Sequence, residues 1–196
     1  LAVFVVLGVA LAPMLTAIFA PGFVGDPQAF ALTAELVRIM FPYLGFISLT
    51  AYAGALLNAH GYFALPAVTP VLLNVCLIAA ALIALDDGLA LTPVVILAWG
   101  VFAAGILQCL LQLPRLSALG LLPRPRLSLK HPGTRQVGTL LLPAMFAASV
   151  GQINALVNTA LASTLIGGSI SWLYYADRLL ELPVGLVAVA LGTVLL

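Results

Sequence analysis

The sequence predicts an all-α, polytopic transmembrane helix bundle, and three observations lead to this fold class. Hydrophobic residues make up 64% of the 196 residues and charged residues only 7%, whereas a soluble domain is about half apolar and about a quarter charged. The mean hydropathy is +1.24. The few charges also separate apolar runs long enough to cross a bilayer, which takes roughly 20 residues. Lipid is therefore the expected solvent for most of these side chains.

The positions of charges, prolines and glycines predict six helices. They are expected at about 1–19, 28–58, 66–85, 91–113, 135–166 and from 171 to the end. No charge occurs from Ile39 to Leu85, a stretch too long for one span, so a turn is expected at 58–62, where Asn and Gly occur. Pro42 is expected to kink the second helix.

The six spans fall into two groups. Residues 1–117 hold four of them, 118–134 form a connector rich in Pro and Arg, and 135–196 hold the last two. Both ends of the chain lie in apolar sequence, and the opening has no initiator Met and no basic region, so it does not resemble a signal peptide. We expect an internal piece of a longer membrane protein, in which 1–117 end a first lobe and 135–196 begin a second.

The basic residues predict the orientation. Five of the seven lie in or beside the connector, namely Arg115, Arg124, Arg126, Lys130 and Arg135. The positive-inside rule places this connector in the cytoplasm. The turns at Asp26, Asp86-Asp87 and Gly167-Gly168 are then outside, and the turn at His60 is inside. A patch for lipid headgroups or nucleic acid is the alternative; we adopt the topology signal and expect no nucleic-acid partner.

No motif for catalysis is present in the sequence. It contains no Walker A loop, no GxGxxG and no HExxH, and two histidines in expected turns do not make a Ser-His-acid set. Cys76 and Cys109 lie in apolar runs and give no metal-ligand spacing with His60 or His131. We expect no enzyme activity, no cofactor and no metal site.

The fifth expected helix has one face of small and polar residues. Its members recur at spacings of three and four and are Ala144, Ala147, Ala148, Gly151, Asn154, Ala155, Asn158 and Ala162. Such a face can serve close helix packing or form one wall of a polar cavity, and both interpretations stay open. A weaker stripe on the second helix, with Ala51, Ala55 and Asn58, is interpreted as helix packing.

The sixth expected helix combines an aromatic belt with charges. Trp172, Tyr174 and Tyr175 suit a membrane interface, and Asp177, Arg178 and Glu181 follow. At 1.5 Å per residue, Arg178 lies about 9 Å below Trp172. At that depth an ionisable side chain should face protein or water rather than lipid, and Arg178 and Glu181 are spaced to pair. In the alternative, the helix enters lipid only after Pro183.

Several segments resemble the MurJ/MviN family of lipid II flippases. They are Ala20-Pro21-Gly22-Phe23, Phe41-Pro42-Tyr43, LNAHGYFALPAVTPVLLN (57–74), LAWGVFAAGILQCLLQLPRL (97–116) and SWLYYADRLLELPVGLVAVALGTVLL (171–196). The resemblance implies a fourteen-helix protein of the bacterial inner membrane, in the MOP exporter superfamily. Such a protein flips the undecaprenyl-linked peptidoglycan precursor lipid II outward, and this chain would correspond to helices three to eight.

The resemblance also implies a site. An arginine in the YADR motif of the family lines a cationic cavity, and it corresponds to Arg178. We expect Arg178, Glu181, Asn154 and Asn158 to contact substrate, with lipid II, membrane lipids and the remaining helices of the same protein as partners. The family's other cavity arginines belong to the first two helices, which precede this sequence.

Two other functions compete with the flippase. A MATE-like, ion-coupled exporter of small amphipathic solutes would favour acidic cavity residues, for which Asp177 and Glu181 are the candidates. A structural membrane module that packs against a partner would need no charge in a cavity. The electrostatic potential of the cavity in the intact protein separates the three: positive, negative or neither.

Overall fold

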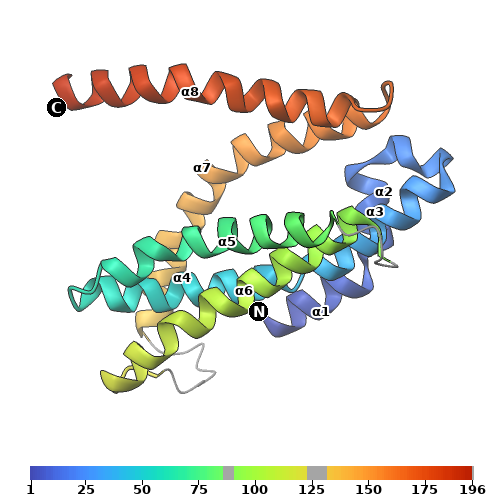
Figure 1. Cartoon of the computed structure of the whole chain (residues 1–196). Helices are drawn as coiled ribbons and strands as arrows, with labels where there is room; N and C mark the ends of the chain where they lie inside the picture. Colours follow the sequence, from blue (N-terminus) through green and yellow to red (C-terminus); the bar gives the residue numbers. More distant parts are fainter. Residues whose placement is uncertain (86–90, 123–131, 196) are drawn as a thin grey trace. The chain divides into compact units, whose positions relative to one another are not determined.

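The computed structural model describes residues 1–85, 91–122 and 132–195, and every regular element in these ranges is a helix (Figure 1). The prediction of an all-α fold is confirmed. In chain order the elements are α1 (Ala2–Ala10), α2 (Ala12–Phe19), the 3-10 helix η1 (Pro21–Gly25), α3 (Pro27–Met40), α4 (Tyr43–Ala59), α5 (Ala64–Ile83), α6 (Pro93–Ala118), α7 (Pro132–Ser163) and α8 (Ser169–Leu195).

Four stretches of the described chain are long and apolar enough to cross a membrane. They are Pro27–Ala59, which joins α3 and α4, Ala64–Ile83, Pro93–Ala118 and Gln136–Ser163. The bent pair α1 and α2 makes a fifth if it is one span. The chain is therefore a multi-pass membrane protein. Helix α8 is not in this set, so the sixth span stays a prediction.

Prolines interrupt two of the predicted helices, one at a position that was predicted and one at a position that was not. The first run was predicted as one helix over 1–19, which is wrong: α1 and α2 are bent by 72° at Leu11. Pro13 explains the bend because it has no N–H and its ring clashes with the carbonyl four residues earlier. The predicted kink at Pro42 is confirmed, since α3 ends at Met40 and α4 begins at Tyr43.

The predicted end of the fourth helix at Leu113 is also wrong. Helix α6 continues through Pro114 to Ala118. A proline this close to a helix end removes a single backbone hydrogen bond and leaves room for a last turn. The connector was predicted to begin at residue 118, and helix α6 ends at Ala118.

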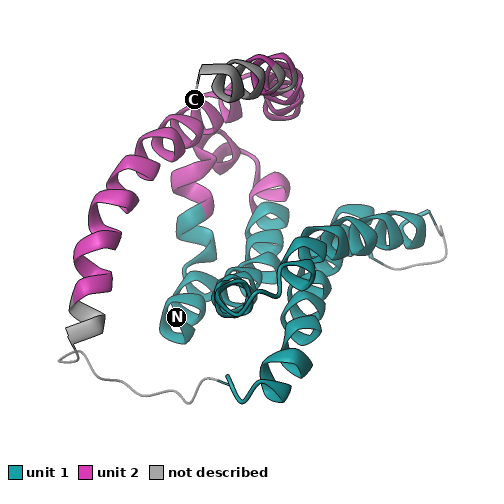
Figure 2. Cartoon of the chain, turned by 90° about the vertical axis from the view of Figure 1, so that its left-hand side faces the viewer, with its two compact units in different colours: residues 1–15, 31–127 teal, residues 16–30, 128–196 magenta. Residues whose placement is uncertain are grey.

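The described chain forms two compact units (Figure 2). The first unit comprises Leu1–Leu15 and Ala31–Leu127, and the second comprises Thr16–Phe30 and Ser128–Leu196. The lobes expected at 1–117 and 135–196 refer to the full-length protein and stay a prediction. Several residues on which the predicted orientation rests, Arg124, Arg126, Lys130 and the Asp86-Asp87 turn, lie outside the described residues.

In the first unit, α6 packs against both α4 and α5. Glycines permit this close approach: a Cβ at Gly100 would lie 2.6 Å from the Cβ of Ala80 on α5, and one at Gly105 would lie 2.7 Å from the ring of Tyr43 on α4. Small residues at helix interfaces let backbones approach in this way inside membranes. Leu57 and Leu116 are fully covered where α4 meets the end of α6.

One end of the first unit is fixed by a contact between Tyr62 and Arg115. The Arg115 guanidinium lies 4.0 Å from the centre of the Tyr62 ring, a cation–π contact. Tyr62 follows the turn at Gly61, whose φ of +80° suits glycine. The His60 turn and the end of α6 therefore lie at the same end of the unit, as expected if both are cytoplasmic.

The second unit joins two turns that are far apart in sequence. The backbone N–H of Gly22 in η1 donates to the hydroxyl of Ser163 at the end of α7, at 3.1 Å. A Cβ on Gly22 would overlap the carbonyl oxygen of Ser163. The turn at 20–26 and the Gly167-Gly168 turn therefore lie together, as expected if both are on the outer side.

Candidate functional site

Arg178 and Glu181 lie one turn apart on α8 and form an ion pair. The Nη1 of Arg178 is 2.6 Å from the Oε2 of Glu181. The guanidinium also lies 5.2 Å from the centre of the Tyr174 ring. Within the described structure both side chains are more than half exposed, at 59% and 65%. Because a guanidinium carries five N–H donors in a planar fork, the pair leaves donors for a second acceptor.

Asn158 lines a pocket at the junction of α7 and α8. The pocket has a volume of about 480 Å³ and includes Trp172, Leu173 and Ala176 from α8. Arg178 and Glu181 are not among its lining residues, and neither is Asn154, which lies one turn before Asn158 on an exposed part of α7. The structure thus pairs Arg178 with Glu181 and sets Asn158 at a separate pocket. The four residues as one substrate site stay a prediction.

The small and polar face of α7 is mostly uncovered in the described structure. Of its predicted members only Ala162 is buried, at 7% exposure, beside the contact with η1. Within the span Gln136–Ser163, an apolar stretch of 18 residues has no residue buried inside the described chain. Both interpretations of the face, helix packing and cavity wall, therefore still apply to its longer part.

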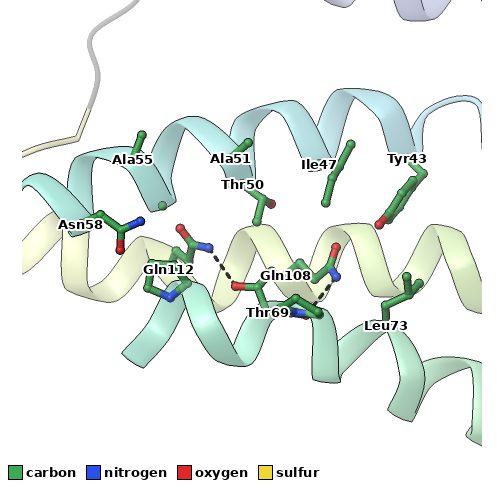
Figure 3. A pocket seen from close by; sticks show the side chains of 13 residues that line it. Tyr43, Ile47, Thr50, Ala51, Ala55, Asn58, Thr69, Leu73, Gln108 and Gln112 are labelled. Atoms are coloured by element: carbon green, nitrogen blue, oxygen red, sulfur yellow. Dashed lines mark hydrogen bonds between the residues drawn. The ribbon is translucent and has the colours of Figure 1, made fainter. Parts of the chain in front are cut away.

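A buried polar cluster in the first unit was missed by the sequence analysis (Figure 3). The Nε2 of Gln108 donates to the carbonyl of Thr69, and the Nε2 of Gln112 donates to the hydroxyl of Thr69, each at 3.0 Å. All three residues are almost fully buried, at 1%, 1% and 6% exposure. Two amides spaced four apart in an apolar span were the available signal, because polar side chains in spans face the protein interior.

This cluster adjoins a groove of about 410 Å³ between α4 and α5, with α6 behind it (Figure 3). Its lining includes Tyr43, Ile47, Thr50, Ala51, Gly54, Ala55 and Asn58 of α4, Pro66, Thr69, Pro70 and Leu73 of α5, and Gln108 and Gln112 of α6. Most of these side chains are apolar or small. Across the described residues no group of three or more His, Cys, Asp or Glu could hold a metal ion.

These features define a class of protein: a multi-pass membrane protein with apolar spans, a buried amide cluster and an exposed arginine–glutamate pair beside an aromatic belt. The family model described as "Lipid II flippase MurJ" matches residues 1–196. The chain therefore belongs to the MurJ lipid II flippase family.

Curated relatives cover the same stretch. The lipid II flippase MurJ of Burkholderia cenocepacia is 46% identical over 200 residues, which is 100% of this chain and 38% of the relative. The probable lipid II flippase MurJ of Vibrio cholerae is 47% identical over 97% of the chain and 37% of the relative. That of Rhizobium meliloti is 41% identical over 91% of the chain and 34% of the relative. The chain thus spans little more than a third of these relatives.

Proposed function

We propose that the full-length protein flips lipid II across the bacterial inner membrane for cell-wall synthesis. The observation that carries this proposal is the family match over all of residues 1–196, with relatives named as lipid II flippases. Because the chain spans 38% of the first of these relatives, the activity is proposed for the full-length protein.

Arg178 is the residue we assign to the diphosphate of the substrate. Arginine binds phosphate oxygens bidentately, and its charge does not depend on pH in the physiological range. In the empty site Glu181 holds the guanidinium through the ion pair. A diphosphate brings more negative charge than one carboxylate, so it can replace Glu181 as the partner. Asn154 and Asn158 supply amide groups for the polar headgroup from α7.

The proposed transport cycle is alternating access between two lobes. The headgroup crosses in a polar cavity that opens to one side at a time, while the lipid tail stays in the bilayer. The headgroup and the tail take different routes because moving a charged headgroup into hydrocarbon costs free energy, whereas an undecaprenyl chain is itself apolar.

Complementation tests the function. The full-length gene is expressed in a bacterium depleted of its own lipid II flippase, and growth and cell shape are followed. Restored growth is the expected result. Failure to restore growth by a protein that is present in the membrane at normal abundance would contradict the proposal.

The orientation yields a separate prediction. Single cysteines replacing Arg126 or Asp87 are labelled with a membrane-impermeant thiol reagent in intact cells and in inverted vesicles. The Asp87→Cys variant should react in intact cells and Arg126→Cys only in inverted vesicles, because the basic connector is placed in the cytoplasm. Cys76 and Cys109, both partly buried in spans, should stay unlabelled. Reaction of Arg126→Cys in intact cells would reverse the topology.

A further inference from the structure

The polar cluster of the first unit contains acceptors that no donor satisfies. A carbonyl only accepts, so Gln108 must turn its amide nitrogen toward the carbonyl of Thr69. The hydroxyl of Thr69 donates to the carbonyl of Leu65 at 3.1 Å, so it must accept from the nitrogen of Gln112. The orientation of both amides is therefore fixed by their partners. Their oxygens are left over.

Three buried oxygen atoms have no hydrogen-bond partner within the described part of the chain. They are the Oε1 atoms of Gln108 and Gln112 and the Oγ1 of Thr50, on residues only 1%, 1% and 3% exposed. The carbonyl of Pro66 also lacks its usual donor, since Pro70 has no N–H. In the hydrocarbon region no water can compensate such groups, and each costs free energy.

The groove beside these oxygens is lined by small residues, as is common where one transmembrane helix packs against another. Ala51, Gly54 and Ala55 follow one another along α4 at the groove, and small residues let a second helix approach closely. Most of the full-length protein lies outside this chain, which covers 38% of the first relative described above. The part of the full-length protein outside this chain can therefore supply a helix that fills the groove of about 410 Å³.

We propose that this groove is the seat of a transmembrane helix from the part of the full-length protein outside residues 1–196. That helix carries side chains that donate hydrogen bonds to the oxygens of Thr50, Gln108 and Gln112. Lipid tails would leave these acceptors unpaired, and the predominantly small and apolar lining favours a packed helix over a water-filled channel.

An isosteric substitution in the full-length protein tests the hydrogen bond. Thr50→Val keeps the shape and removes a hydroxyl that has no partner among the described residues. With a helix seated, the melting temperature of the purified protein should fall by about 2 °C or more, as for a lost buried hydrogen bond. With no helix, removing an unpaired hydroxyl leaves the melting temperature unchanged or raises it, which would overturn the proposal.

The matched control is Thr159→Val on α7. Its hydroxyl already donates to the carbonyl of Ala155 in its own helix at 2.9 Å, and it does not line the groove. The same Thr→Val exchange should therefore change the melting temperature less than at Thr50. Equal falls at both positions would mean that the hydroxyl of Thr50 has no special partner, and would count against the seat.

A spin label identifies what covers the groove. The label is attached at Ala51→Cys, or at Ala55→Cys if the first variant does not fold, in full-length protein held as single copies in nanodiscs. Low accessibility to both oxygen and a water-soluble nickel complex is expected, because a helix excludes both. High oxygen accessibility would show lipid in the groove, and high nickel accessibility would show water; either result overturns the proposal. Val75→Cys, at a position on α5 that does not line the groove and is 53% exposed within the described chain, provides the comparison.

Discussion

Replacing Arg178 with alanine in the full-length protein is expected to abolish transport while membrane insertion and abundance stay nearly normal. Without the guanidinium, the diphosphate of lipid II loses the cationic, bidentate partner that we assign to it. The ion pair with Glu181 is a local contact on one face of α8, so its loss should not disturb the fold. Transport of lipid II in cells or in proteoliposomes measures the effect.

Two further variants accompany Arg178→Ala. One tests the geometry of the guanidinium, and the other is a control at a different arginine. Arg178→Lys keeps the charge but loses the planar fork, so it should impair transport if the diphosphate is held bidentately. Arg38→Ala removes another arginine, in the last turn of α3, and should leave transport largely intact. Full activity of Arg178→Ala at normal abundance would mean that Arg178 is an interfacial residue whose charge reaches water.

Gly22→Ala is expected to break the contact between η1 and α7. A Cβ at this position meets the backbone carbonyl of Ser163, and backbone cannot swing aside as a side chain can. Overpacking of this kind costs about 1–3 kcal/mol. The melting temperature of the full-length protein should fall. A cysteine at Ala162, 7% exposed beside the contact, should react faster with maleimide than it does without the Gly22 change.

Gly25→Ala serves as the matched control. It lies in the same 3-10 helix, and a Cβ there meets nothing within 4 Å. Its melting temperature and its Ala162→Cys reactivity should match those of the unsubstituted protein. If Gly22→Ala behaved in the same way as Gly25→Ala, the close approach of η1 to α7 would not exist in the full-length protein.

The helices and most of their turns could be predicted because the signals are local. Apolar runs of spanning length, a glycine at 61 with φ +80° and a proline at 42 each act on their own neighbours. Pro13 gave a weaker signal, because a proline inside an apolar run is compatible with both one bent span and two short helices.

The long-range contacts could not be predicted, because no local pattern specifies them. Thr69 meets Gln108 and Gln112 across 39 and 43 residues, and Gly22 meets Ser163 across 141 residues. Their spacing shows that Gln108 and Gln112 share a helix face, but only the packed structure shows that Thr69 accepts hydrogen bonds from their side-chain nitrogens. The pairing of Arg178 with Glu181 was expected because it spans a single helical turn.

The sidedness of lipid II is the most direct test of the proposal that the full-length protein moves lipid II to the outer face of the inner membrane. In cells that depend on this protein as their only flippase, lipid II is exposed to an enzyme that cleaves it only from the outer face. Most lipid II is expected to become cleavable when the wild-type protein is expressed and to stay protected with Arg178→Ala. Protection of lipid II in cells that express the wild-type protein at normal abundance would show that this protein does not flip lipid II.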